Sequence, residues 1–141
     1  MRGYVASKYE NKEEVRKAQR LLEESGHVIT HDWTWEDDAG KKGEELRVYR
    51  SNCASKDYNG VASGDFIFLI NFLHCAGAYT EFGIALACNK LIVVVDGHHP
   101  EKTHNIFFYL PGVNHFDTIE EAVAFVNYYA QTGRLLEKKE G

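Results

Sequence analysis

Three acidic residues lie where the sequence could use them for chemistry. Glu81 follows a glycine-containing loop at 75–78 and is expected in the first turn of a buried helix, where the helix dipole stabilises a charged carboxylate. A carboxylate there could act as a nucleophile or stabilise positive charge, or it could be a helix-start acid without chemistry. Asp57 and Asp65 bracket residues 58–64, and two carboxylates that flank a glycosidic bond can act as nucleophile and general acid. Spacing alone also fits a surface acid at Asp57 and a turn residue at Asp65, so both interpretations stay open.

The histidines and cysteines do not form a metal or redox pattern. His27 and His31 fall on an expected strand, where a four-residue spacing separates them by about 13 Å. Cys75 follows His74 directly, and side chains of adjacent residues rarely face each other. The chain has three cysteines, an odd number, and no C-x-x-C pair, which argues against a disulfide framework or a zinc knuckle. It also has no Walker A and no G-x-G-x-x-G motif, so we expect neither a metal nor a cofactor.

Composition excludes several function classes. The 141 residues, of 16.1 kDa, amount to one domain. The net charge of −5 and a pI near 5.8 argue against nucleic-acid binding, which needs clustered Lys and Arg. The longest apolar stretches are too short to span a membrane, and the first residues lack the apolar core of a signal peptide. We therefore expect a soluble cytoplasmic protein without a membrane or nucleic-acid partner.

The first third of the chain predicts a βαβ unit. Residues 4–6 form a short apolar strand, and residues 27–32 form a second one. Between them, apolar residues recur at helical spacing, with Asn11 as the expected N-cap, Glu14 as its capping-box partner and Gly26 as the terminating glycine. Strand, helix and strand within about 30 residues imply a parallel sheet.

The rest of the chain continues the alternation of helices and strands. The apolar run at 66–72 lacks polar alternation, which is typical of a strand covered by helices on both faces. The other expected elements are a helix at 43–61, a helix at 80–89, a strand at 91–95, a short strand at 113–116 and a helix at 118–129 capped by Thr118 and Glu121. Residues 134–141 read as a solvated tail. We predict a single α/β domain over 1–141, a three-layer sandwich with a flavodoxin- or Rossmann-like, doubly wound parallel sheet of about five strands.

In such sheets a ligand binds beyond the carboxyl ends of the strands. The sequence places four segments there: residues 6–9, 32–36, 72–81 and 96–109.

Four segments in order resemble one enzyme family. Gly77–Lys90 looks like the signature G-x-x-x-E-x-G-x-A-x-x-x-x-K, followed by a hydrophobic strand. Asp57–Val61 with Asp65 resembles a D-L-x-x-I…A-D segment, and Gly3–Ser7 resembles an opening I-Y-x-A-S strand. Asn105–Thr118 is similar to a stretch of short bacterial and phage-type members. Together the segments resemble the nucleoside 2-deoxyribosyltransferase family, including its deoxynucleoside 5′-monophosphate N-glycosidase relatives.

The resemblance implies roles for single residues. Glu81 matches the nucleophile that attacks the anomeric carbon of the sugar, and Asp57 matches the acid that protonates the departing base. Tyr4 matches the tyrosine that orients the nucleophile. Asn105 and Phe107 match positions that complete the sugar pocket of a neighbouring subunit, so the resemblance implies a homo-oligomer, a dimer or higher, with shared active sites. Asp65 matches a position that recurs in the family with a structural role.

One position departs from the family pattern. Many transferases of the family have an aspartate six residues before the nucleophile, where this chain has Cys75. Hydrolase relatives that act on 5′-monophosphates also lack this aspartate and bind phosphate with serines or a basic group, a role that Ser7 and Lys8 could take here. Trp33 and Phe107 could stack on the base. The substrate-binding candidates are thus Ser7, Lys8, Trp33, Cys75, Gly77, Asn105 and Phe107.

The main expectation is an enzyme that cleaves the N-glycosidic bond of a 2′-deoxynucleoside through a covalent intermediate on Glu81. It would transfer the sugar to a free nucleobase or to water. The alternatives are a deoxynucleoside 5′-monophosphate N-hydrolase and, from another class, a non-catalytic nucleotide-binding module on the same fold.

Overall fold

The computed structural model describes residues 1–70, 75–97 and 105–140, with the backbone alone for 134–140. A five-stranded sheet lies at its centre. Its strands are β1 (Arg2–Ala6), β2 (Val28–Ile29), β3 (Phe66–Ile70), β4 (Leu91–Val95) and β5 (Val113–Phe116). All neighbouring strands are parallel, in the order β2-β1-β3-β4-β5. This confirms the predicted doubly wound sheet.

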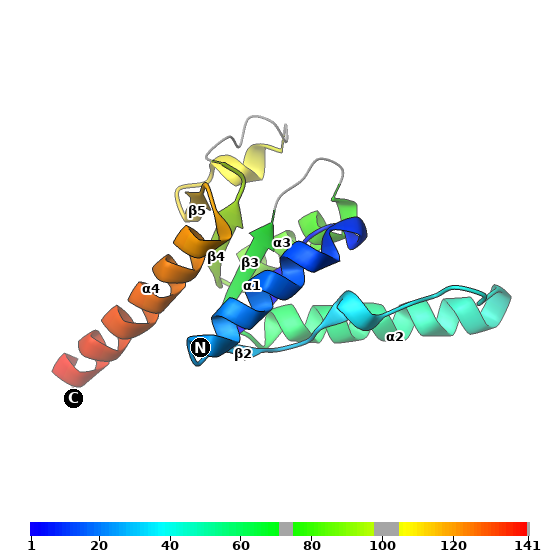
Figure 1. The fold of residues 1–141 in the computed structure, drawn as a ribbon, viewed down its shortest axis with the longest axis horizontal. Coiled ribbons are helices and arrows are strands. Elements are labelled where there is room, and N and C mark those ends of the chain that lie inside the picture. The colour runs from blue at the N-terminus through cyan, green and yellow to red at the C-terminus, as the bar shows by residue number, and fades with distance from the viewer. Residues whose placement is uncertain (71–74, 98–104, 141) are drawn as a thin grey trace.

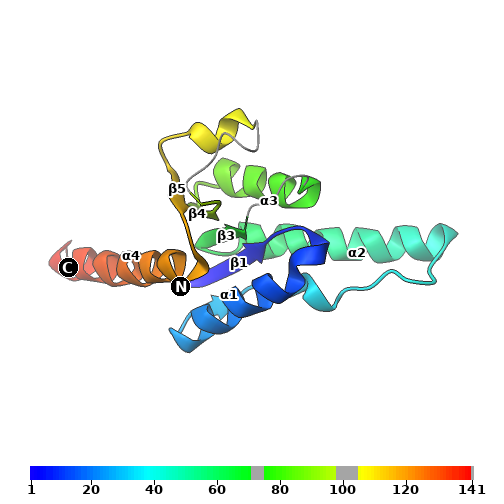
Figure 2. The same ribbon diagram turned by 45° about the horizontal axis from the view of Figure 1, so that its top comes forward.

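Helices cover both faces of the sheet. The four α-helices are α1 (Lys12–Glu24), α2 (Gly43–Ala62), α3 (Ala76–Ala87) and α4 (Ile119–Glu140). Helices α1 and α4 pack together on one face, and α2 and α3 pack together on the other, which gives the predicted three layers (Figures 1 and 2). The end of α2 that begins at Gly43 extends beyond the sheet (Figure 1). Three short 3-10 helices complete the described chain: η1 (Tyr9–Asn11), η2 (Trp33–Trp35) and η4 (Ile106–Tyr109).

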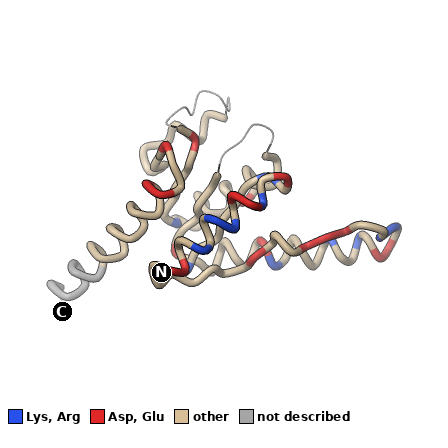
Figure 3. The backbone as a smooth tube through the Cα atoms, viewed as in Figure 1, with Lys and Arg blue, Asp and Glu red and all other residues tan. Residues whose placement is uncertain are grey.

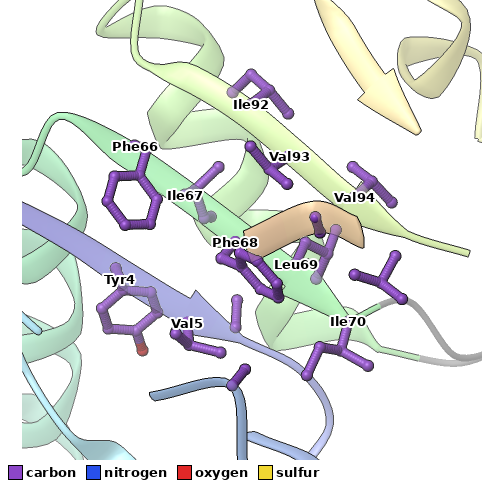
Figure 4. Packing of buried hydrophobic residues seen from close by; sticks show 14 of the residues in the cluster. Tyr4, Val5, Phe66, Ile67, Phe68, Leu69, Ile70, Ile92, Val93 and Val94 are labelled. Atoms are coloured by element: carbon purple, nitrogen blue, oxygen red, sulfur yellow. The ribbon is translucent and has the colours of Figure 1, made fainter. Parts of the chain in front are cut away.

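The core is built around the central strand β3. All five of its residues are buried, as expected of a strand covered on both faces. Figure 4 shows the side chains of β3 packed together with those of β1 and β4, including Tyr4, Val5 and Val93. The predicted extension of this strand to 72 lies outside the described residues.

The structure corrects several predicted boundaries. Helix α3 begins at Ala76 rather than at residue 80, because Tyr79 N–H already donates to the Cys75 carbonyl oxygen and the small residues of 76–78 pack closely enough for Ala78 to be buried. Glu81 therefore lies in the second turn. Strand β2 has two residues rather than six, because the chain turns into η2, where the Asp32 side chain accepts the Thr34 N–H.

Two predicted helix ends also differ. Asn11 makes no side-chain cap on α1, because its amide instead donates to the Ser7 hydroxyl at 3.1 Å. Helix α4 continues to Glu140 instead of ending near 129, since no proline interrupts it and Gly133 keeps a negative φ within it, and so it includes most of the expected tail. The solvation of the side chains at 134–141 lies outside the description. At the start of α4, Glu121 N–H donates to Thr118 Oγ1 at 3.2 Å, which confirms Thr118 as a cap.

Asp65 has the structural role that its turn position suggested. Its side chain accepts the Arg2 N–H at 2.8 Å, and its own N–H donates to the Arg2 carbonyl oxygen at 2.7 Å. The residue thus joins the start of β1 to the start of β3.

Charges of both signs are interspersed along α1 and α2 (Figure 3). This arrangement does not form the basic face that phosphate backbones require. No helix in the described part of the chain is both long and apolar enough to cross a membrane.

Strands β1 and β3 of the core approach each other closely at Gly3. It pairs in register with Phe66, and a Cβ at Gly3 would lie 2.0 Å from Cζ of the Phe66 ring. The ring is buried, with an edge-to-face contact to His27, so it can move away only by disturbing the packed core. We predict that Gly3→Ala lowers the free energy of unfolding by about 1–3 kcal/mol, as overpacked cores do, measured by urea denaturation.

Gly83→Ala is the matched control. Gly83 is an exposed helical position of α3 with nothing within 4 Å of an added Cβ. That substitution should be neutral or stabilising, by up to about 1 kcal/mol. Equal effects of the two substitutions would contradict the packing argument.

Candidate active site

A cavity of about 790 Å³ opens at the carboxyl ends of β1 and β3. The strand order reverses between these two strands, where ligands of doubly wound sheets bind. The volume is that of a small-molecule site. Eight of the residues that the sequence singled out line it: Tyr4, Ser7, Lys8, Trp33, Asp57, Cys75, Gly77 and Glu81. Parts of two predicted crevice segments, 72–74 and 98–104, lie outside the described residues.

Tyr4 and Glu81 form the central contact of the cavity. Tyr4 projects from β1, its side chain is 1% exposed, and its hydroxyl donates to Glu81 Oε2 of α3 in a very short hydrogen bond. Gly60 of α2 allows this placement, since a Cβ at Gly60 would lie only 3.0 Å from Cδ2 of the Tyr4 ring. Burial and the nearby carboxylates, Glu81 first, raise the pKa of Tyr4 far above its ordinary value. The phenol therefore stays neutral and remains a hydrogen-bond donor.

Glu81 is buried in this cavity as a carboxyl group with a perturbed pKa. Burial raises its pKa from 4.5 to about 8, the hydrogen bond from Tyr4 opposes the rise, and the charges of Asp57 and Glu36 add to it. Because Glu81 lies in the second turn of α3, the helix dipole contributes less than its predicted first-turn position implied. The pKa of Glu81 therefore depends mainly on its burial and on the hydrogen bond from Tyr4.

Asp57 faces the same cavity from α2, the helix opposite α3 in this layer. Burial raises its pKa from 3.8 to about 6, the negative charge of Glu36 adds to the rise, and His31 opposes it. The surface-acid interpretation of Asp57 is therefore wrong. The cavity has a partly buried carboxyl group on each of two helices, and Tyr4 of β1 interacts with both of them.

Two residues that sequence reasoning missed adjoin Asp57. Glu36, directly after η2, lines the cavity, and His31 Nε2 lies 3.0 Å from Glu36 Oε1 and 3.6 Å from Asp57 Oδ1. Glu36 falls within the predicted crevice segment 32–36, so its position was the available signal. The three side chains have one ligand-type atom each within 4.8 Å of one another. They already form contacts with one another, and we assign no metal to them.

Other predicted residues line the cavity while serving the fold. The Ser7 hydroxyl donates to the Ile70 carbonyl oxygen at 2.7 Å, so its proton is engaged within the protein. The Trp33 indole N–H donates to the Val5 carbonyl oxygen at 2.7 Å, which fixes the ring against β1. Cys75 is buried directly before α3. Their contacts with a substrate stay predictions.

Asn105 and Phe107 do not line this cavity. They lie on η4, where the Asn105 side chain accepts the Phe107 N–H at 3.1 Å and the Phe107 ring is 55% exposed. Their position is consistent with the expectation that they serve a neighbouring subunit, which a single chain does not test.

The described cavity wall is strongly acidic. It has six carboxyl groups, those of Glu10, Glu36, Asp37, Asp38, Asp57 and Glu81. Among the described lining residues, Lys8 and Arg50 are the cationic side chains, and Arg50 pairs with Asp38 at 3.0 Å. Such a wall repels anions and attracts developing positive charge.

Comparison with known proteins supports the fold. No protein-family model and no curated protein matches the sequence. The structure superposes with a TM-score of 0.62 on the CMP N-glycosidase BcmB of Clostridium botulinum, over 92% of this chain and 99% of that chain. It superposes with a TM-score of 0.58 on a 2-deoxyribosyltransferase of Bacillus psychrosaccharolyticus, over 87% of this chain and 90% of that chain. Each is 18% identical to this chain, a level at which the likeness establishes a shared fold.

The raised pKa of Glu81 makes a prediction about stability. Because the folded-state pKa lies above the ordinary value, this group contributes stability below about pH 4.5 that is lost as the pH rises through about 8. Glu81→Gln removes the ionisable group and keeps an acceptor for Tyr4. We expect the variant to exceed the wild type in free energy of unfolding by roughly 2–4 kcal/mol at pH 9, and by little at pH 4, measured by urea denaturation.

Glu24→Gln, at an exposed position on α1, is the control and should show no such pH-dependent difference. A constant difference between Glu81→Gln and the wild type from pH 4 to pH 9 would contradict the burial of an ionisable Glu81.

Proposed function

We propose that the protein cleaves the N-glycosidic bond of a 2′-deoxynucleoside and transfers the deoxyribosyl group to another nucleobase or to water. The observation that carries this proposal is the hydrogen bond from buried Tyr4 to Glu81, with Asp57 facing the same cavity. The cavity thus has a carboxylate suited to act as nucleophile on one wall and a carboxyl group suited to donate a proton on another, as glycosidic chemistry requires. The fold shared with an N-glycosidase and a deoxyribosyltransferase agrees with it.

The first step displaces the base from the sugar. A Glu81 carboxylate oxygen forms a bond to the anomeric carbon while the bond from that carbon to the base nitrogen breaks, and its electron pair goes to the base. Asp57 gives its proton to the base and becomes a carboxylate. The Tyr4 hydroxyl donates a hydrogen bond to Glu81 and so orients the attacking carboxylate. The negative charge of Glu81 stabilises the oxocarbenium-like sugar.

The second step releases Glu81. Asp57 takes a proton from an incoming base or from water, whose nitrogen or oxygen bonds to the anomeric carbon as the bond to Glu81 breaks. If the acceptor is a nucleobase, the enzyme acts as a transferase, and if the acceptor is water, it acts as a hydrolase.

The acidic wall favours a nucleoside over its 5′-monophosphate. A phosphate dianion would enter a cavity whose described lining has six carboxyl groups against Lys8 and Arg50, and the Ser7 hydroxyl proton is already engaged. The 5′-monophosphate N-hydrolase is the second candidate, because one structure with this fold is a CMP N-glycosidase.

The exposed side of η4 supports the proposed homo-oligomer. Four of the five residues at 106–110 are apolar and exposed, namely Ile106 (75%), Phe107 (55%), Tyr109 (58%) and Leu110 (43%), and Phe108 between them is buried. An apolar patch of this kind usually marks an interaction surface. We propose that a second copy of the chain covers it and that Asn105 and Phe107 reach the partner's cavity.

Glu81→Ala tests the activity. Loss of the nucleophile should reduce the release of free base from 2′-deoxynucleosides by at least about a thousandfold, measured by chromatography with and without a second base. The same assay with deoxynucleoside 5′-monophosphates and with CMP separates nucleoside from nucleotide substrates. Rapidly quenched wild type should have a deoxyribosyl group on the Glu81 peptide in mass spectrometry.

The matched control for this assay is Glu24→Ala, an exposed acid distant from the cavity, which should keep full activity. Unchanged turnover in Glu81→Ala would refute the assignment. Ligand-induced thermal stabilisation of the wild type without any turnover would instead indicate the non-catalytic binding module.

Ile106→Asp tests the oligomer. A charge in the covered patch should shift the wild-type dimer or larger species to a monomer in size-exclusion chromatography with light scattering, and lower activity with it. Val48→Asp, at a half-exposed apolar position on α2, should leave the mass unchanged. A wild type that is monomeric at micromolar concentration would contradict the proposal.

A further inference from the structure

We propose that Glu36 is a positioning residue that shares a proton with Asp57 and so keeps the Asp57 carboxyl available as the proton donor to the leaving base. This inference rests on the proposed function and adds to it a residue that neither the motifs nor the comparisons identified.

The geometry favours a proton between the two carboxyl groups, since one oxygen of each lies within 4.8 Å of the other. Glu36 Oε2 and Asp57 Oδ1 are both buried, and neither has a hydrogen-bond partner among the described residues. Two buried carboxylate oxygens without donors are costly, whereas one proton held between the groups satisfies both. A hydrogen bond between Glu36 and Asp57, which forms only when one of them is protonated, is among the interactions that raise the pKa of Asp57.

Donors around the pair place the negative charge on Glu36. His31 Nε2 lies 3.0 Å from Glu36 Oε1, within hydrogen-bond distance, but 3.6 Å from Asp57 Oδ1, which is beyond it. Tyr4 interacts with both Glu81 and Asp57, but its single hydroxyl proton goes to Glu81 in the short hydrogen bond between them. His31 is therefore placed to stabilise a negative charge on Glu36, and we place the shared proton on Asp57.

The titratable groups of every neighbouring element enter this balance. Glu36 follows η2, His31 follows β2, Tyr4 comes from β1 and Glu81 from α3. The remaining titratable or charged groups on the walls near the pair are Tyr49, Arg50 and Cys53 of α2, together with Lys8, Glu10, Asp37 and Asp38. Acids predominate among these groups, so few positive charges offset the negative charge of Glu36. That charge therefore disfavours the ionisation of Asp57.

The proton shared with Glu36 is the proton that the reaction uses. When the base departs, the Asp57 proton moves to a base nitrogen, and Asp57 is left ionised beside ionised Glu36. That repulsion favours the return of a proton from the incoming base or water in the second step, which restores the pair.

The wild type should show a bell-shaped dependence of kcat/KM on pH. Below about pH 6 both Glu81 and Asp57 are protonated, and above about pH 8 both are ionised, so the pair carries one proton between these limits. The reacting form has that proton on Asp57, and it is the minor form because the pKa of Glu81 is the higher of the two.

Glu36→Gln tests the proposal through this profile. Glutamine keeps the shape and the contact with Asp57 but removes the charge that favours the protonated Asp57. The acidic limb should move to lower pH by about one unit, so that kcat/KM falls about tenfold between pH 7 and pH 8 and changes little below pH 5. Glu36→Asp, which keeps the charge, should restore much of the loss at pH 8, and Glu45→Gln, an exposed acid on α2, should leave the profile unchanged.

A second measurement is independent of turnover. The carboxyl carbon of Asp57, followed by NMR in the substrate-free protein, should titrate at a pH lower by about one unit in Glu36→Gln than in the wild type and in Glu45→Gln. This readout distinguishes a failure of the inference from a failure of the proposed function, because it needs no substrate. An unchanged titration of Asp57, or a shifted titration with an unchanged pH profile, would overturn the role of Glu36. So would loss of activity in EDTA that a divalent cation restores, since the three groups would then bind a cation rather than a proton.

Discussion

The hydrogen bond from Tyr4 to Glu81 is the contact on which the site depends. It joins the first strand to the helix that follows the central strand, and it lies at the carboxyl ends of β1 and β3, where the strand order reverses. It provides a donor to a carboxyl group whose burial raises its pKa. Without that donor, a charged Glu81 inside this cavity would have little to offset its desolvation.

The surrounding packing serves to hold this contact. Gly60 lets α2 approach the Tyr4 ring, and Gly3 lets the Phe66 ring lie over β1. Asp65 fixes the register between β1 and β3 through paired hydrogen bonds with Arg2. Tyr4 and the acids of α2 and α3 are thus positioned by rigid elements rather than by loops, which preorganised catalysis favours.

Acid clustering in the cavity connects stability with chemistry. Three carboxyl groups, those of Glu36, Asp57 and Glu81, lie near one another and are partly withdrawn from water, so they cannot all ionise at neutral pH without a large penalty. A protein selected for stability alone would not keep these three carboxyl groups together. Their retained proton is the property that an N-glycosidic reaction needs, because the departing base must be protonated.

The alternation of helices and strands and the buried central strand follow from local periodicity. The sequence offered Glu81, Asp57 and Tyr4 as candidate residues through motifs that resemble one enzyme family. It misplaced the start of α3 and the length of β2, because tight packing of small residues and side-chain caps are not visible in periodicity. The folded structure was needed to show that Glu36 and His31 adjoin Asp57, that Ser7 and Trp33 hydrogen-bond to the sheet, and that Asn105 and Phe107 lie outside the cavity of their own chain. Which side chains meet across elements depends on strand order and helix packing, and no one-dimensional spacing contains that information.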